Sequence, residues 1–352
     1  MRPSPLARFL LAAYSLLIAY ASLYPLAGWR DSGVSALAFL AAPWPRYLTA
    51  FDLGANIFAY TPYGLLCALA VHPRLRGAGA VLLAALTGGV LALGLEAAQS
   101  FLPARIASNV DLLANLAGAA LGAVAGVLLA PWLLEEGPLR RVRGWAFLAG
   151  AETDLGLTLL GLWLFAQLSP ATLLFGAGDL RDLLAAEGVE YGAELFISVE
   201  AATTAANLLA VTLLASALLA PGAPARAVCG ALVAAALAVK ILAFAILMQA
   251  EDVLAWLTPG AQQGLAAGFV LMLATVALPR TARLALAAML LMMATVLVNL
   301  APPNPYLAAT LKVWTQGHFL HFNGLTHLVS VAWPFAALAY LFYLASRRAR
   351  ER

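Results

Sequence analysis

The sequence predicts an all-α, polytopic membrane protein: a bundle of about ten transmembrane helices with both termini on the cytoplasmic side. Three observations lead to this prediction. Hydrophobic residues make up 63% of the 352 residues and charged residues only 11%, whereas soluble domains average roughly 45–50% and 25%. The apolar residues fall in blocks of about 20, the length a helix needs to cross a hydrocarbon core. Positive charges gather on one side of these blocks, as they do in membrane proteins.

Ten apolar segments follow one another along the chain, and no gap between them is long enough for a soluble domain. Most are built from Leu, Ala and Val, and only the second to fourth carry a dense set of polar side chains. In order, the segments are residues 6–26, 52–71, 80–100, 111–134, 146–168, 195–220, 227–250, 261–279, 284–300 and 324–345.

The Lys and Arg residues predict the orientation, because short cytoplasmic loops carry an excess of both. With the N-terminus inside, 14 of the 20 Lys and Arg residues lie inside, five lie outside, and Lys240 lies within a segment. An even number of spans keeps the basic N-terminus and the basic C-terminal tail on the same side, which favours ten. The chain is therefore expected in the cell membrane as a multi-pass protein. The fourteen are Arg2, Arg8, Arg74, Arg76, Arg140, Arg141, Arg143, Arg226, Arg280, Arg283, Arg347, Arg348, Arg350 and Arg352.

The composition also argues against several other classes of function. Nucleic-acid binding needs basic patches on a soluble surface, and the sequence has none. Cys67 and Cys229 both lie in apolar segments, where a free Cys behaves as a small hydrophobe. His318, His321 and His327 are grouped near the last outer loop, but no Cys or H-E-x-x-H motif accompanies them. We expect no metal and no cofactor.

A repeated polar pattern marks the second and fourth segments. Asp52 and Asn56 form a D-x-x-x-N motif at the start of the second, and Asp111 and Asn115 repeat it at the start of the fourth. Residues four apart lie on the same face of a helix. Both segments run from outside to inside, so both motifs are expected near the outer surface.

The third segment runs the opposite way and brings more polar groups to that surface. It ends with Glu96 and Gln99, and Arg105 follows in a short outer loop. A carboxylate in hydrocarbon costs several kcal/mol unless it is paired or lies in a wet cavity. We therefore expect Arg105 within ion-pair reach of Glu96 or Asp111. We also expect one cavity, open to the outer face and lined by Asp52, Glu96, Gln99, Arg105, Asp111 and Asn115.

Roles for these side chains follow from their chemistry. The carboxylates of Glu96, Asp52 and Asp111 are candidates for proton transfer in catalysis. Arg105 is a candidate anion clamp, and the amides, Gln99, Asn56 and Asn115, are candidates for substrate binding. The alternative is structural, with the two Asp residues as helix N-caps and the amides as hydrogen bonds between helices.

This ordered set of residues resembles the VanZ-like membrane domain, a family named for a teicoplanin-resistance protein. The resemblance covers about residues 10–134. It implies a four-helix domain at residues 1–144, an envelope-related role and a link to antibiotic resistance, followed by a six-helix region of unknown function at residues 145–352. The matching pattern is Asp52…Asn56…Phe58…Pro62…Gly64, Glu96-x-x-Gln99-x-Phe101, Arg105, and Asp111…Asn115…Gly118…Gly122.

The second half carries one deeply placed charge. Lys240 lies about ten residues from the outer end of its segment, a depth of about 15 Å at 1.5 Å per residue. Glu200 and Asn207 lie on one face of the preceding segment, and we expect Lys240 to meet one of them, either as a structural pair or as part of a transport path. Residues 169–194 are expected to form a solvated acidic loop or a short helix on the membrane surface.

Three functions remain open at this point. The outer site binds or modifies an envelope lipid, amphiphile or glycopeptide-like ligand; or the protein transports such an amphiphile by way of Lys240 and Glu200; or the chain is a structural scaffold. No G-x-S-x-G motif indicates a covalent nucleophile, so the residues do not decide whether the protein is an enzyme. A membrane lipid or an amphiphilic envelope ligand is the expected partner.

Overall fold

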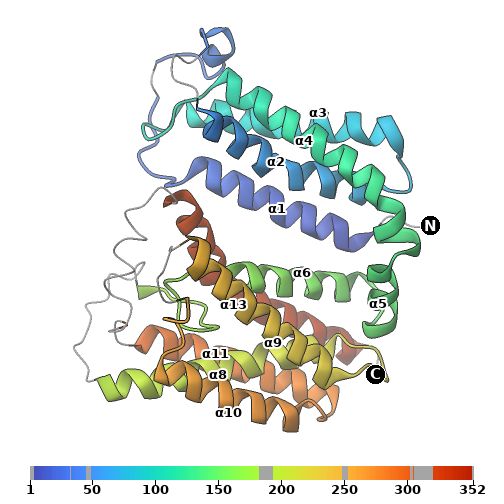
Figure 1. Cartoon of the computed structure of the whole chain (residues 1–352), viewed down its shortest axis with the longest axis vertical. Helices are drawn as coiled ribbons and strands as arrows, with labels where there is room; N and C mark the ends of the chain where they lie inside the picture. The colour runs from blue at the N-terminus through green and yellow to red at the C-terminus, as the bar shows by residue number, and fades with distance from the viewer. Residues whose placement is uncertain are drawn as a thin grey trace. The chain divides into compact units, whose positions relative to one another are not determined.

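Helices are the regular secondary structure of the part of the chain that the structure describes. The computed structural model describes residues 4–31, 33–44, 49–181, 193–247, 253–301, 304 and 320–350. These ranges hold eleven α-helices and no strand, apart from an isolated bridge between Phe147 and Leu219 (Figure 1). Eight of the helices are long and apolar enough to cross a membrane. The predicted all-helical, membrane-spanning class is therefore confirmed.

The membrane-length helices agree with eight of the ten predicted segments. In the N-terminal half they are α1 (Pro5–Leu23), α2 (Ala50–Val71), α3 (Gly77–Gln99) and α4 (Asn109–Ala130), which the π-helical turn η2 (Pro131–Glu136) continues. In the C-terminal half they are α8 (Ala193–Ala217), α9 (Ala225–Leu242) with the π-helical turn η3 (Ala243–Leu247), α11 (Arg280–Leu300) and α13 (Leu320–Arg350).

The other two predicted segments are shorter helices. They are α6 (Ala151–Ala166), with 16 residues, and α10 (Pro259–Thr275), with 17 residues. The residues directly before each of these two helices determine where it begins. Gly150, with φ +119, separates α6 from the short α5 (Pro138–Ala146), and Thr258 caps α10 directly before its first-turn proline.

The chain divides into two compact units, Met1–Trp145 and Ala146–Arg352. In the N-terminal unit α2 packs mainly against α4 and also against α1, while α3 packs against α4 (Figure 1). A short 3-10 turn, η1 (Ala38–Ala41), lies in the segment between α1 and α2.

Glycines allow α2 and α4 to touch along their backbones. A Cβ added at Gly118 would overlap the carbonyl oxygen of Ile57, and one added at Gly122 would overlap that of Thr61. The contacts advance by four residues on both helices, so α2 and α4 run parallel. Small residues at this spacing let helices approach closely in a membrane. The parallel register brings the first turns of both helices to the same end of the unit.

Helix α3 runs antiparallel to this pair and adds its last turn to that end. A Cβ at Gly88 would lie 2.7 Å from the Cβ of Ala119. Counting eight residues along each chain from this contact, forward on α3 and backward on α4, places Glu96 level with Asp111. The packing of three helices thus gathers their polar ends.

In the C-terminal unit α8 is the most enclosed helix. It packs against α10 and α11, and Thr203, Thr204 and Asn207 along it are fully buried. Helix α6 packs instead against α13, where the Trp333 indole donates to the carbonyl oxygen of Leu159 at 2.7 Å.

The segment after α6 corrects the sequence-based expectation of a solvated loop. Ser169 and Phe175 are fully buried within a non-helical stretch, residues 167–180. Buried backbone must find hydrogen-bond partners, and polar side chains provide them: Thr204 of α8 donates to the Leu174 carbonyl, and Asn299 of α11 donates to that of Gly178. The acidic residues Asp182, Glu187 and Glu190 lie outside the described residues.

Candidate functional site

Two hydroxyl side chains begin the helices that carry the polar site. The Thr49 hydroxyl accepts a hydrogen bond from the Asp52 backbone N–H at 3.1 Å, and that of Ser108 accepts from the Asp111 N–H at 3.3 Å. Thr49 and Ser108 are therefore the N-caps, and the alternative that the Asp residues fill this role is wrong. The two Asp residues lie in the first turn of their helices, where the helix dipole favours negative charge.

The two carboxylates and one amide of this site come together across α2 and α4. Asp52 is exposed, and its Oδ2 accepts a hydrogen bond from the Thr49 hydroxyl at 2.6 Å. Asp111 is half-buried and interacts with the charge of Asp52 and with the side-chain amide of Asn56. This end of the unit therefore presents a pair of carboxylates to the outside of the bundle.

Glu96 lies deeper, beside this pair. Its side chain is 4% exposed, and Oε2 accepts a hydrogen bond from the Ser108 backbone N–H at 2.8 Å. Its charge interacts with those of Asp111 and Arg105. Burial lowers the pKa of Arg105 from its ordinary value, while the charge of Glu96 opposes the shift; a guanidinium still stays protonated. Glu96, Arg105 and Asp111 thus form one electrostatic cluster.

Gln99 and Arg105 bind the end of α1. The Gln99 amide donates to the carbonyl oxygen of Ser22 at 2.9 Å, and the Arg105 guanidinium donates to those of Ala21 at 2.6 Å and Tyr24 at 3.1 Å. Carbonyls in the last turn of a helix lack partners within the helix, and a cation there also complements the dipole. Arg105 therefore fastens α1 to the α3–α4 loop.

Two buried oxygen atoms at this site have unused hydrogen-bonding capacity. Asn115 is 5% exposed and Tyr60 is 3% exposed. Among the residues that the structure describes, neither Asn115 Oδ1 nor the Tyr60 hydroxyl has a hydrogen-bond partner. Nearly all buried polar atoms in proteins are hydrogen-bonded to protein, water or ligand. The two atoms are therefore available to a water molecule or to a polar group of a ligand.

Lys240 and Glu200 have separate partners, so the expected pairing between them is wrong. Lys240, 1% exposed, donates to the carbonyl oxygen of Ser169 at 2.7 Å. Glu200, 2% exposed, accepts from the Thr258 hydroxyl. The other expected partner, Asn207, donates to a carbonyl of its own helix. The carbonyl oxygens of Ser169 and Thr172, in the buried stretch after α6, therefore hold the Lys240 side-chain nitrogen.

The predicted histidine group is only partly described. His327 lies on α13, whereas His318 and the side chain of His321 lie outside the described part. In the ranges that the structure covers, no group of three His, Cys, Asp or Glu side chains is arranged to hold a metal ion.

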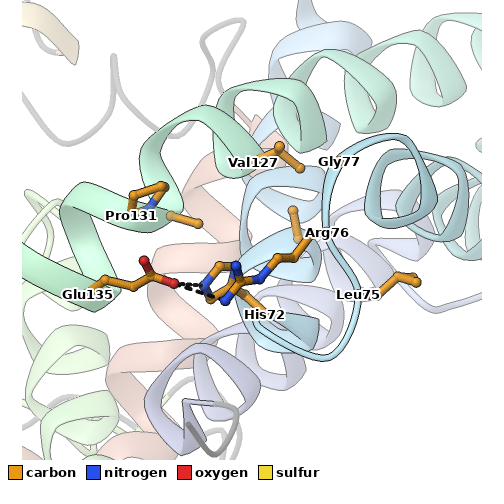
Figure 2. Close-up of a pocket in the computed structure, with 9 residues that line it drawn as sticks. His72, Leu75, Arg76, Gly77, Val127, Pro131 and Glu135 are labelled. Atoms are coloured by element: carbon orange, nitrogen blue, oxygen red, sulfur yellow. Dashed lines mark hydrogen bonds and ion pairs between the residues drawn. The ribbon is translucent and has the colours of Figure 1, made fainter.

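A pocket at the opposite end of α2 and α4 was missed by the sequence analysis. Its volume is about 120 Å³, and His72 and Glu135 meet in it at 2.8 Å (Figure 2). The signal was available: parallel helices that bring Asp52 and Asp111 together at their starts also bring the residues at their ends together. The pocket is lined by Ala68, His72, Leu75, Arg76, Gly77, Val127, Ala130, Pro131 and Glu135.

Comparison with known proteins agrees with this architecture. An all-helical chain with eight membrane-length helices is a multi-pass membrane protein. The family model described as VanZ/LLP1 matches residues 9–130, from α1 to the end of α4, so the N-terminal part of the chain is similar to the proteins of that family. The resemblance noted from the residues is thereby confirmed. No curated protein and no solved structure matches the chain.

Proposed function

We propose that the N-terminal unit binds an envelope lipid or amphiphile at its outer face, through hydroxyl or amine groups of the ligand. The unpartnered oxygen atoms of Asn115 and Tyr60, on the two helices that begin with the Asp111 and Asp52 carboxylates, are the observation that carries the proposal. Ionised carboxylates accept hydrogen bonds and cannot donate them. A site of this composition favours a headgroup rich in donors.

The site binds the ligand, and none of its residues is assigned a role in catalysis. Asp52 and Asp111 are the acceptors at the mouth, Asn56 positions Asp111, and Asn115 is the acceptor deeper in the site. Glu96 holds the start of α4 through the Ser108 N–H. Transport by way of Lys240 and Glu200 has less support, because the two side chains take partners from different segments.

Two phospholipids that differ in their donors test the binding proposal. The ammonium group of phosphatidylethanolamine has N–H donors, whereas the quaternary ammonium group of phosphatidylcholine has no N–H donor. The full chain, purified in detergent with an equimolar mixture of both, is analysed by native mass spectrometry for the lipid it retains. A hydrogen bond to a charged group is worth about 1.5–3 kcal/mol, so we expect about a tenfold preference for phosphatidylethanolamine or more.

The variants make the result specific to the site. The double variant Asp52→Asn, Asp111→Asn is expected to lose the preference, and Asp31→Asn, an exposed acidic residue outside the site, is expected to keep it. Equal retention of both lipids by the unchanged chain would refute donor recognition. In that case, the polar residues serve only to hold the helices together and the chain is a scaffold.

We further propose ten spans in the cell membrane, with both termini in the cytoplasm. The count adds α6 and α10 to the eight long helices. At 1.5 Å per residue the 16 residues of α6 extend about 24 Å, a mismatch that local thinning of the bilayer accommodates. The 14-to-5 division of basic residues supports the orientation. A reporter that is active only outside the cytoplasm, fused after Arg352, is expected to stay silent; activity would refute this topology.

A further inference from the structure

The pocket that holds His72 and Glu135 lies where three membrane-length helices end or begin. It is formed by the last turns of α2, the first residues of α3 and the turn η2 after α4 (Figure 2). The spans themselves end at Val71 and Glu135 and begin at Gly77, so the pocket lies at the level of the lipid headgroups. None of the residues assigned to the outer-face site contributes to it.

Two donors converge on one carboxylate oxygen in this pocket. Glu135 Oε1 lies 2.8 Å from His72 Nε2 and 3.2 Å from an Nη2 of Arg76 (Figure 2). His72 is 7% exposed, whereas the Arg76 side chain is 62% exposed. A histidine and an arginine that share one anionic oxygen are also placed to share an oxygen of a phosphate group. The carboxylate of Glu135 occupies the position that such an oxygen would take.

Glu135 is held by a segment of irregular helix. It lies in the π-helical turn η2, a conformation that occurs in short pieces and often at functional sites. The Arg140 side chain donates to the backbone carbonyl oxygen of Glu135. The Arg8 side chain donates to the backbone carbonyl oxygen of Ala70, at the end of α2. Arg74 is exposed on the same turn as Arg76. Further basic residues therefore belong to the helix ends that form the pocket, and Glu135 is the one carboxylate among its lining residues.

The rest of the wall is apolar. Ala68, Leu75, Val127, Ala130 and Pro131 line it. A pocket that combines cationic donors with an apolar wall, at the depth of the headgroups, suits an amphiphile that carries a negative charge next to hydrocarbon. Basic pockets between helices on the cytoplasmic side are known to take anionic headgroups. Glu136, next in the chain, lies outside the described side chains. Among those that line the pocket, His72 and Arg76 are the basic groups and Glu135 is the one carboxylate, which agrees with this ligand class.

We propose that this pocket binds the phosphate group of an anionic phospholipid, with Arg76 and His72 as its donors and Glu135 as the internal anion that the phosphate displaces. The site lies at the other end of α2 and α4 from the outer-face site and does not depend on the function proposed there. It gives the N-terminal unit a second lipid-binding site. This site selects lipids by their negative charge, whereas the outer-face site selects them by their hydrogen-bond donors.

Phosphatidylglycerol and phosphatidylcholine test the proposal, because both contain a phosphate and only the first has a net negative charge. The full chain is incubated with an equimolar mixture, and native mass spectrometry measures the ratio of the two retained lipids. Arg76→Gln is expected to lower the retention of phosphatidylglycerol about tenfold, the effect of one charge-assisted hydrogen bond. Glu135→Gln is expected to raise it several-fold, because the internal competitor loses its charge.

Arg74→Gln is the matched control, since it removes the same charge from the same turn outside the pocket. It is expected to change the ratio less than twofold. An equal loss for Arg74→Gln and Arg76→Gln would refute the pocket and indicate diffuse surface electrostatics. Lower retention of phosphatidylglycerol by Glu135→Gln would also refute the proposal, because the role of Glu135 would then be only to hold the helices together. Melting in phosphatidylcholine alone checks that each variant is folded.

A further arm separates the lipid from free phosphate. Inorganic phosphate at millimolar concentration is added to the mixture. If retention of phosphatidylglycerol is unchanged, the acyl part contributes and the lipid is the ligand, as proposed. If inorganic phosphate displaces it fully, the pocket is a site for the free anion and the lipid assignment is overturned. The outer-face experiment compares two lipids of equal net charge, so the two proposals fail independently.

Discussion

The contact between α2 and α4 makes a quantitative prediction at Gly122. A Cβ at this position overlaps the Thr61 carbonyl oxygen, and backbone cannot move aside as a flexible side chain can. In Gly122→Ala the two helices must separate, which weakens the packing on either side of the contact. Overpacking of this kind costs about 1–3 kcal/mol. We expect the free energy of unfolding to fall by that amount.

Gly94 supplies the matched control for this substitution. It lies inside α3, and a Cβ there would meet no atom within 4 Å. Alanine favours a helix over glycine by up to about 1 kcal/mol, so Gly94→Ala is expected to stabilise the chain slightly. The two alanine variants should therefore differ by about 1–4 kcal/mol.

Unfolding of the purified chain in mixed micelles, titrated with dodecyl sulfate and followed by circular dichroism, measures the difference. If Gly122→Ala were as stable as Gly94→Ala, the helices would not be in backbone contact. The parallel register that brings Asp52 to Asp111 would then lose its main support.

Two further predictions concern single hydrogen bonds, and a third concerns an ion pair. Ser108→Ala removes the cap of α4 and is expected to lower stability by about 1 kcal/mol, measured in the same titration; an unchanged midpoint would contradict the assigned cap. Trp333→Phe removes the buried indole N–H that donates to Leu159 and should cost about 0.5–1.5 kcal/mol, and no loss would exclude this bond. Burial raises the pKa of Asp179, but the hydrogen bonds and charge of Arg181 outweigh it and hold that pKa below its ordinary value. The stability that Asp179 adds is thus complete above its unfolded pKa of about 3.9 and is lost as pH falls through the lower folded value. The advantage of the unchanged chain over Asp179→Asn should shrink only below about pH 4, and shrinkage near neutral pH would contradict the pairing.

The helices and the ends at which polar groups gather were within reach of the sequence. An apolar block of about 20 residues has few alternatives to a membrane helix, and four-residue spacing fixes which side chains share a face. The D-x-x-x-N motifs in α2 and α4 were therefore recognised as equivalent. The four-residue spacing of Gly118 and Gly122 is likewise typical of close helix packing, although it does not name α2 as the partner.

The partners of individual polar groups were decided only by tertiary structure. Arg105 lies near Glu96 in the sequence but donates to the last turn of α1, more than 80 residues earlier in the chain. Lys240 donates to a carbonyl of a stretch that composition had indicated to be solvated.

The physical reason is the same in both cases. A charged or polar group in a membrane takes whichever unsatisfied backbone group the packing brings within reach. Helix ends and buried irregular segments expose such carbonyls, and their positions depend on how distant helices meet. The meeting of His72 with Glu135, 63 residues apart, has this origin too: local sequence makes the helices, and only their register makes the pocket.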